Sequence, residues 1–360
     1  MRRLVATVRY HRRNDSARSG LTILELVVVT GIIAVLASLL LPAVQQVRAA
    51  SRRLQCKNNL RNVNLAMIQV AERDQRFPAC GTFGKLGMHH SWVLELLPFL
   101  DKSSVSDAWN RDSGFSDPAN QAIATTHIAV LTCPDDLSVA GQGDLSFVVN
   151  GGVGFTAQVS DGTHDCPIHP SSGRLDLNGD GVTCPPDPSL DGTPTDKQHF
   201  LRLGLFFNET YKWDVTVRHH RLGSVVDGLS QTITLAENAR TGYDPGNPTA
   251  SNWSTSNPYR TSFYIGDPCA GAPCVEGSVD YARANADQYR INSGVKLPEG
   301  GSTAPNSFHP GGVNVAFGDG RVVFLNESID GGVYAALVSP QGLQLAETPL
   351  RQGIAPDLSE

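Results

Sequence analysis

The chain changes from basic to strongly apolar within Arg18-Ser19-Gly20-Leu21-Thr22-Ile23-Leu24-Glu25-Leu26-Val27-Val28-Val29, and the apolar run continues to Leu41. A helix from Leu21 to Leu41 would be about 31 Å long, which is enough to cross the hydrocarbon core of a bilayer. We therefore predict a transmembrane helix over residues 21–42. Glu25 is the one charged residue in this run. A carboxylate near the start of such a helix costs about 2–3 kcal/mol, so we expect it to have a role.

The first 20 residues hold six arginines and one aspartate. By the positive-inside rule, this basic segment stays in the cytoplasm and the rest of the chain is exported. We therefore expect a single-pass protein of the inner (cytoplasmic) membrane. Its leader would be cytoplasmic and its body would lie in the periplasm or at the cell surface.

A small residue precedes the apolar run instead of following it. A secretory signal peptide carries its small-residue cleavage site after the run, whereas Gly20 stands between the basic segment and the helix. This order resembles the leader of type IV prepilins and pseudopilins. The resemblance implies that a prepilin peptidase cuts between Gly20 and Leu21 and methylates the new amine, and that Glu25 is the charged residue of the mature helix. The alternative is a plain signal anchor with a chance Gly and Glu.

The composition indicates a folded, exported body. The 360 residues are 40% hydrophobic and 18% charged, with 35 Gly and 22 Pro, which favours strands joined by many turns. The formal net charge is −6, and removal of a leader of net charge +5 leaves about −11. An acidic exported body argues against nucleic acid as a partner.

After Pro42 the pattern changes to that of an amphipathic helix over residues 43–75. Apolar residues recur at steps of four and three, which predicts one buried stripe; they are Cys56, Leu60, Val63, Met67 and Val70. Pro42 is expected to bend the helix or open it locally. Residues 76–360 then form an α+β domain, with residues 158–200 as an inserted acidic surface loop rich in Asp and Pro.

Seven cysteines follow the apolar run, in a compartment where disulfides persist. Cys166 and Cys184 bracket one loop, and Cys269 and Cys274 bracket another, so we predict these two pairs. Three cysteines remain, and because seven is odd, at least one thiol is free or intermolecular; the three are Cys56, Cys80 and Cys133.

A hairpin is predicted near the C-terminus. Asp319-Gly320 lies between alternating apolar runs, which is typical of a two-residue turn. In that register Phe317 would face Val322 and Val315 would face Phe324, and the single apolar face would lie on the core.

The spacing of His309 from Asp319-Gly320 resembles the His-x9-Asp-Gly signature of the DUF1559 family of prepilin-leader proteins. Other stretches resemble the same family, including residues 55–60, 91–92, 133–135 and 227–233. The resemblance implies an architecture and little about activity. His309 and Asp319 could pair as a base and an orienting carboxylate, but no nucleophile motif accompanies them. We therefore interpret His309, Asp319 and Gly320 as a structural motif and expect no enzyme activity.

The best ligand motif runs from Asp176 to Asp187. Oxygen side chains or carbonyls at alternate positions and a Gly at the sixth follow the pattern of a calcium loop, which predicts Ca²⁺ as a possible ligand; the residues are Asp176, Asn178, Asp180, Val182 and Asp187. The closing residue is Asp instead of Glu, and Pro185-Pro186 excludes the usual exiting helix. The alternative is an Asp/Asn/Gly turn in a solvated loop.

These features together favour an α+β, pilin-like fold: a long N-terminal helix, membrane-spanning in its first half, packed on an antiparallel β-sheet with loop-rich insertions. The expected function is structural, as a pseudopilin-like subunit of a type II secretion or type IV pilus-like assembly. Its partners would be the prepilin peptidase, neighbouring pilin-like subunits and the inner membrane. The alternative is a non-polymerising, membrane-anchored surface module that binds calcium and an extracellular ligand. A third class, an exported hydrolase, has no recognisable catalytic constellation.

Overall fold

The computed structural model describes residues 22–84, 87–158, 165–183, 195–210, 220–248 and 251–353. The chain divides into two compact units, residues 1–50 and residues 51–360. The predicted leader and Leu21 lie outside the described residues, so the proposed cleavage site stays a prediction.

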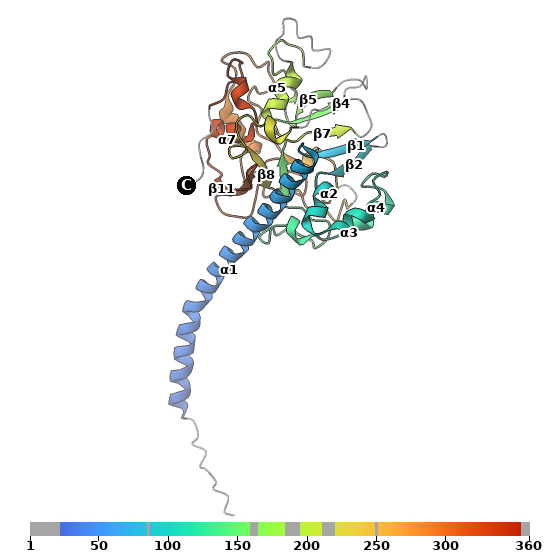
Figure 1. Ribbon diagram of the computed structural model, residues 1–360. Coiled ribbons are helices and arrows are strands. Elements are labelled where there is room, and N and C mark those ends of the chain that lie inside the picture. Colours follow the sequence, from blue (N-terminus) through green and yellow to red (C-terminus); the bar gives the residue numbers. More distant parts are fainter. Residues whose placement is uncertain are drawn as a thin grey trace, which may run out of the picture. The chain divides into compact units, whose positions relative to one another are not determined.

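The helix α1 spans Ile23–Asp74, 52 residues (Figure 1). It begins with a reciprocal cap. The backbone N–H of Thr22 donates to Oε2 of Glu25 at 2.9 Å, and the N–H of Glu25 donates to Oγ1 of Thr22 at 3.2 Å. This Thr-x-x-Glu arrangement is a capping box, which satisfies amides that have no partner within the helix. Part of the role of Glu25 is therefore to start α1.

The first part of α1 is apolar and exposed. Its large side chains, from Ile23 to Val47, are exposed to solvent. In the part of the chain that the structure describes, α1 is the one helix long and apolar enough to cross a membrane. It is therefore a candidate single membrane span or signal sequence. The helix also continues through Pro42 without a break.

The last part of α1, from Ser51, belongs to the second unit. The predicted apolar stripe is confirmed, because each of its five residues is 0% exposed; they are Cys56, Leu60, Val63, Met67 and Val70. The helix ends at Asp74, shortly before Phe77-Pro78.

The central sheet of the second unit has the strand order β11-β10-β8-β3-β9. Neighbouring strands are antiparallel except β3 and β9, which are parallel. The strands span β3 Phe147–Asn150, β8 Ile233–Glu237, β9 Ser262–Phe263, β10 Gly312–Phe317 and β11 Val322–Asn326.

Two smaller sheets have the orders β2-β1-β7 and β4-β5-β6. Their strands are β1 Gly81–Gly84, β2 Gly87–Ser91, β7 Asn208–Thr210, β4 Phe155–Gln158, β5 Asp165–His169 and β6 Gly173–Arg174. The shorter α-helices are α2 Val93–Leu96, α3 Ser103–Ala108, α4 Pro118–Ala124, α5 Asp196–Leu203, α6 Pro258–Thr261 and α7 Gly331–Val338. Short 3₁₀ segments span Leu97–Leu100, Ala129–Leu131, Leu222–Ser224, Tyr281–Asn285, Asp287–Tyr289 and Gly342–Leu345.

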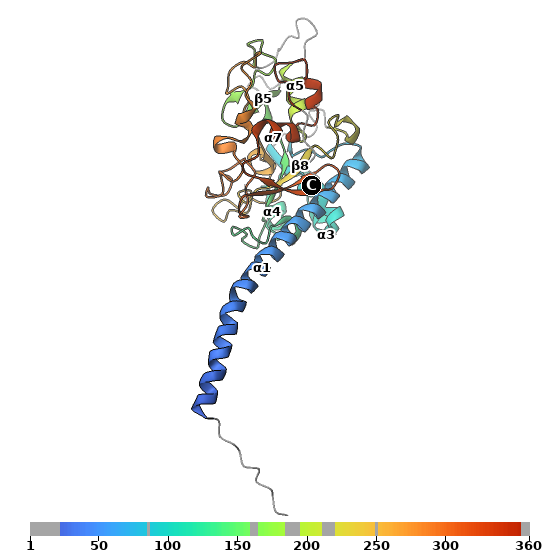
Figure 2. The same ribbon diagram turned by 90° about the vertical axis from the view of Figure 1, so that its left-hand side faces the viewer.

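The central sheet is buried on both faces. On one face, Phe147, Leu235 and Ala316 pack in a core with the α1 stripe. On the other, Val148, Val313 and Val315 pack in a core that includes residues of α5 and α7, which lie near each other in Figure 2. The predicted α+β fold, with a long helix on a largely antiparallel sheet, is confirmed. The predicted apolar face of the hairpin does lie on a core, since Val315 and Phe317 of β10 are buried there. The other face of β10 is buried as well, because Ala316 packs in the core with α1.

The predicted hairpin register is wrong, by one residue. Ala316 pairs with Val322 and Asn314 with Phe324. Gly320 N donates to Phe317 O at 2.9 Å, and Gly320 has φ +90°. The loop is therefore a three-residue turn that closes in the left-handed region, a common alternative to a two-residue turn.

The acidic segment 158–200 was predicted to be a surface loop. Its described parts contain two strands and buried side chains. It contributes β5 and β6, and the side chains of Leu175 and Leu177 are buried in the core beside α5. These two leucines anchor the segment to the body.

Candidate functional site

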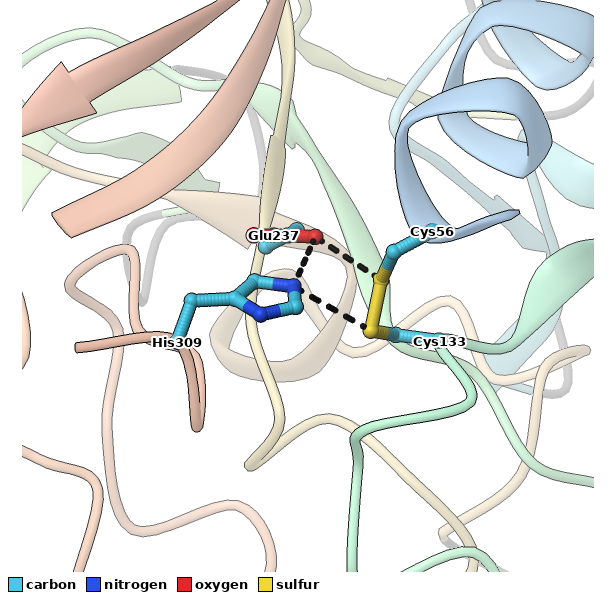
Figure 3. Close-up of side chains that lie close together, drawn as sticks. All are labelled: Cys56, Cys133, Glu237 and His309. Atoms are coloured by element: carbon cyan, nitrogen blue, oxygen red, sulfur yellow. Dashed lines mark hydrogen bonds and ion pairs between the residues drawn. A yellow bond between two sulfur atoms is a disulfide. The ribbon is translucent and has the colours of Figure 1, made fainter. Parts of the chain in front are cut away.

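Four chemically reactive side chains meet between α1 and the central sheet, although they are distant in sequence (Figure 3). Cys56 is part of the buried stripe of α1, and Glu237 is the last residue of β8. Cys133 follows the short helix Ala129–Leu131 and begins a turn, since its carbonyl accepts the N–H of Asp136 at 2.9 Å. His309 lies just before β10, with its N–H donating to Ser307 Oγ at 3.1 Å.

The ligand atoms of these residues all lie within 4.8 Å of one another. Cys56 and Cys133 form a disulfide. Oε1 of Glu237 lies 3.0 Å from Cys56 Sγ and 3.3 Å from His309 Nε2, which itself lies 3.6 Å from Cys133 Sγ. None of the four residues is more than 5% exposed. We call this group the Cys-Glu-His cluster.

Outer groups fix both polar members of the cluster. Asn314 donates to Glu237 twice, from its backbone N–H at 2.7 Å and from Nδ2 at 2.9 Å. His309 Nδ1 lies 3.3 Å from Asp135 Oδ2, and Asp135 also pairs with Arg52 of α1. Because a buried charge needs such partners, these contacts hold the carboxylate of Glu237 and orient the imidazole of His309.

In its oxidised form the cluster ties the helix to the body. The Cys56–Cys133 bond spans a sequence separation of 77 residues. In the chain-entropy model, closing a loop of that length stabilises the fold by about 4–5 kcal/mol. The same side chains are also those that bind soft or borderline metal ions, namely two thiols, an imidazole and a carboxylate.

The disulfide predictions have mixed outcomes. The Cys269–Cys274 pair is confirmed. Cys166 is also disulfide-bonded, but Cys184 lies outside the described residues. Cys56 and Cys133, left unpaired by sequence reasoning, are bonded to each other, and Cys80 is the free thiol of the described residues. Burial raises the pKa of the Cys80 thiol to about 12, which keeps it protonated and unreactive.

His309 and Asp319 have separate contacts. Asp319 accepts a hydrogen bond at 2.9 Å from the backbone N–H of Arg321 in its own turn. His309 instead faces Asp135 and Glu237. Sequence reasoning did not select Glu237, although a lone acid ending the apolar strand Ile233–Glu237 was a signal.

The predicted calcium loop uses its first carboxylate on its own backbone. Asp176 is 4% exposed and accepts the N–H groups of Gly179 at 2.7 Å and Gly181 at 2.8 Å. Asn178 donates to Asp180 at 3.0 Å. Val182 is also described, whereas Asp187 lies outside the described residues.

Among described residues, the Cys-Glu-His cluster is the one group of His, Cys, Asp and Glu side chains close enough to hold a metal ion. Calcium binding stays a prediction.

One other group has the residue types of a hydrolase. Ser172 Oγ lies 2.8 Å from His169 Nδ1 and 2.6 Å from Asp267 Oδ2, while His169 Nε2 lies 3.1 Å from the carbonyl of Ile265. In a catalytic triad the carboxylate orients the histidine. Here Asp267 contacts the serine instead, and the backbone N–H of Ser172 donates to His169 Nδ1 at 3.3 Å, so these side chains stabilise the turn between β5 and β6.

The sequence profile of a family described as "Protein of unknown function (DUF1559)" matches residues 45–332. No curated protein and no solved structure matches the chain. The matched range includes all four residues of the Cys-Glu-His cluster.

Proposed function

The chain belongs to this family, DUF1559, and we propose that it is a structural, pseudopilin-like subunit of a type II secretion or type IV pilus-like assembly. The observation that carries the proposal is that the two parts of α1 differ in burial. Its first part is apolar and exposed, and its last part carries a stripe buried in the body. Such a helix suits lipid and neighbouring helices at one end and a folded domain at the other.

The start of α1 supports a role in assembly. Both hydrogen bonds that Thr22 donates to the carboxylate of Glu25 go to Oε2. Oε1 is then available to the free amine of Leu21 in an adjacent subunit. A carboxylate and an amine paired in the membrane would offset each other's cost and set the axial register.

The disulfides support export of the body. Cys56–Cys133 and Cys269–Cys274 are the pairs between described residues, and such bonds persist outside the cytoplasm. We therefore propose an inner-membrane anchor with the basic leader inside and the body outside.

Processing by a prepilin peptidase tests this proposal. Mass spectrometry of the membrane-purified protein should find a mature chain that begins with methylated Leu21. Gly20→Glu should keep the basic leader, because a pocket that admits only hydrogen at this position cannot take a carboxylate. Ser19→Ala, one residue away, should be processed normally. A wild-type protein that keeps its leader would overturn the proposal.

A further inference from the structure

We propose that Cys56, Cys133, Glu237 and His309 form a binding site for Zn²⁺ when the Cys56–Cys133 disulfide is reduced. The Cys-Glu-His cluster would then have two alternative states, a disulfide and a zinc-bound dithiolate. The proposal does not depend on the pseudopilin role.

The distances in the cluster are already close to those of a tetrahedral site. With metal–ligand bonds of about 2.0–2.3 Å, neighbouring ligand atoms around zinc lie about 3.2–3.8 Å apart. The Glu237–Cys56, Glu237–His309 and Cys133–His309 separations are 3.0, 3.3 and 3.6 Å. Binding therefore requires mainly that the two sulfur atoms, which are bonded to each other in the disulfide, move apart. This movement makes room for the ion between the four ligands.

The ligand types and their surroundings also suit zinc. Two thiolates, an imidazole and a carboxylate are all ligands that this ion accepts, and four protein ligands complete its coordination. His309 presents Nε2 to the cluster while Nδ1 faces Asp135, the carboxylate–histidine–zinc arrangement that orients a ligating imidazole. The hydrogen bonds from Asn314 hold Glu237 in the same way.

Four protein ligands and near-complete burial indicate a site without an open position for substrate. The zinc would therefore be structural. It would join α1 to the turn that begins at Cys133, as the disulfide does, and would hold this junction whenever the Cys56–Cys133 bond is reduced.

The conversion between the states is balanced with a dithiol as the reductant. The dithiol gives two electrons and two protons to the Cys56–Cys133 bond and becomes a cyclic or linear disulfide itself, which leaves two thiols on the chain. Zn²⁺ then binds both sulfurs and displaces two protons into solvent. In the reverse direction a small-molecule disulfide is the oxidant: it takes two electrons from the dithiolate and two protons from solvent and becomes two thiols, while the Cys56–Cys133 bond re-forms and Zn²⁺ is released.

Cobalt substitution in the full chain, purified in detergent, tests the site. The protein is reduced under anaerobic conditions with a phosphine, and the thiols of Cys56 and Cys133 are verified by alkylation and peptide mass spectrometry. Co²⁺ is then added. We expect one ion per chain, with a thiolate-to-cobalt charge-transfer band and the visible bands of tetrahedral Co²⁺. Zn²⁺ should displace it and protect both cysteines from alkylation.

Variants separate this site from other thiols. His309→Ala and Glu237→Gln should lose the tetrahedral spectrum, and Asp135→Asn should keep it with about 10–100-fold weaker binding, because Asp135 only positions His309. The double variant Cys269→Ser/Cys274→Ser removes the other disulfide between described residues and should leave binding unchanged. Near-ultraviolet circular dichroism verifies that each variant is folded.

Three results would overturn the proposal. The first is a folded, reduced wild-type chain that binds no cobalt. The second is a cobalt spectrum that survives in folded His309→Ala. The third is a Cys56–Cys133 bond that the phosphine cannot reduce in the folded protein.

Discussion

Gly320 closes the turn between β10 and β11 in a backbone conformation that most residues avoid. Its φ is +90°, and a Cβ added there would lie 3.3 Å from Leu65 Cδ2 of α1. A β-branched residue is strained in this region and would also press on the helix. We expect Gly320→Val to lower the free energy of unfolding by roughly 1–3 kcal/mol.

Chemical denaturation of the full chain in detergent measures this loss. Gly223→Val is a matched control, because Gly223 has no positive φ and nothing within 4 Å of an added Cβ. Equal stability of Gly320→Val and the wild type would contradict the three-residue turn.

His199 of α5 gives the stability a dependence on pH. Burial, together with the charge of Arg202, lowers the pKa of His199 from 6.5 to about 4. Between these values the unfolded chain binds the proton and the folded chain does not. The stabilisation by neutral His199 is therefore full above about pH 6.5 and is lost as the pH falls toward 4, by about 2–3 kcal/mol.

Thermal unfolding of the full chain across this pH range tests the effect. The His199→Gln variant should lose less stability on acidification than the wild type, because its side chain cannot take up a proton. Parallel curves for the two proteins would show that His199 does not contribute.

At the scale of elements, one buried amide connects α1 to the central sheet. Asn64 is fully buried; its Nδ2 donates to Phe317 O of β10 at 2.8 Å, and its Oδ1 accepts Thr234 Oγ1 of β8 at 2.6 Å. The apolar stripe of α1 supplies most of the contact area between the helix and the sheet. The two hydrogen bonds of Asn64 fix the position of the helix along the strands.

Truncation of this amide should therefore weaken the helix–sheet contact. We expect Asn64→Ala to destabilise the full chain by about 1–3 kcal/mol, because it removes two buried hydrogen bonds, each worth about 0.5–1.5 kcal/mol. Asn62→Ala, on the exposed side of the same turn, should change the free energy of unfolding by less than about 0.5 kcal/mol. Equal effects of the two substitutions would contradict a specific role for Asn64.

The elements show which parts of the fold the sequence predicts. The α1 stripe was predictable because its period of 3.6 follows directly from helix geometry. The turn after β10 was misjudged by one residue, since Asp319-Gly320 suits the end of a three-residue loop as well as the centre of a two-residue loop. The contact of Gly318 distinguishes the two loops. Its N–H donates to Thr232 O, just before β8, at 3.0 Å. Gly318 is therefore not paired with Arg321 across the hairpin, as a two-residue loop would require.

At the scale of the molecule, the Cys-Glu-His cluster was not predictable as a unit. Its members are separated by up to 253 positions in the chain, and disulfide connectivity does not follow from spacing. Cys269 and Cys274 bracket a short loop, and this proximity in sequence made a bond between them predictable. The long-range pair Cys56–Cys133 depends on where α1 packs, which only the folded body determines.

The two ends of α1 lead to a final prediction about assembly. If Glu25 pairs with the Leu21 amine of a neighbouring subunit, loss of its carboxylate leaves that amine uncompensated in the membrane. We expect Ile33→Cys to give disulfide-linked dimers between subunits in native membranes, and the added change Glu25→Ala to reduce their yield several-fold without blocking removal of the leader. Glu72→Ala, which removes an exposed carboxylate near the other end of α1, should leave the yield unchanged. Ile33→Cys protein that stays monomeric in membranes would favour a singly anchored, non-polymerising module instead.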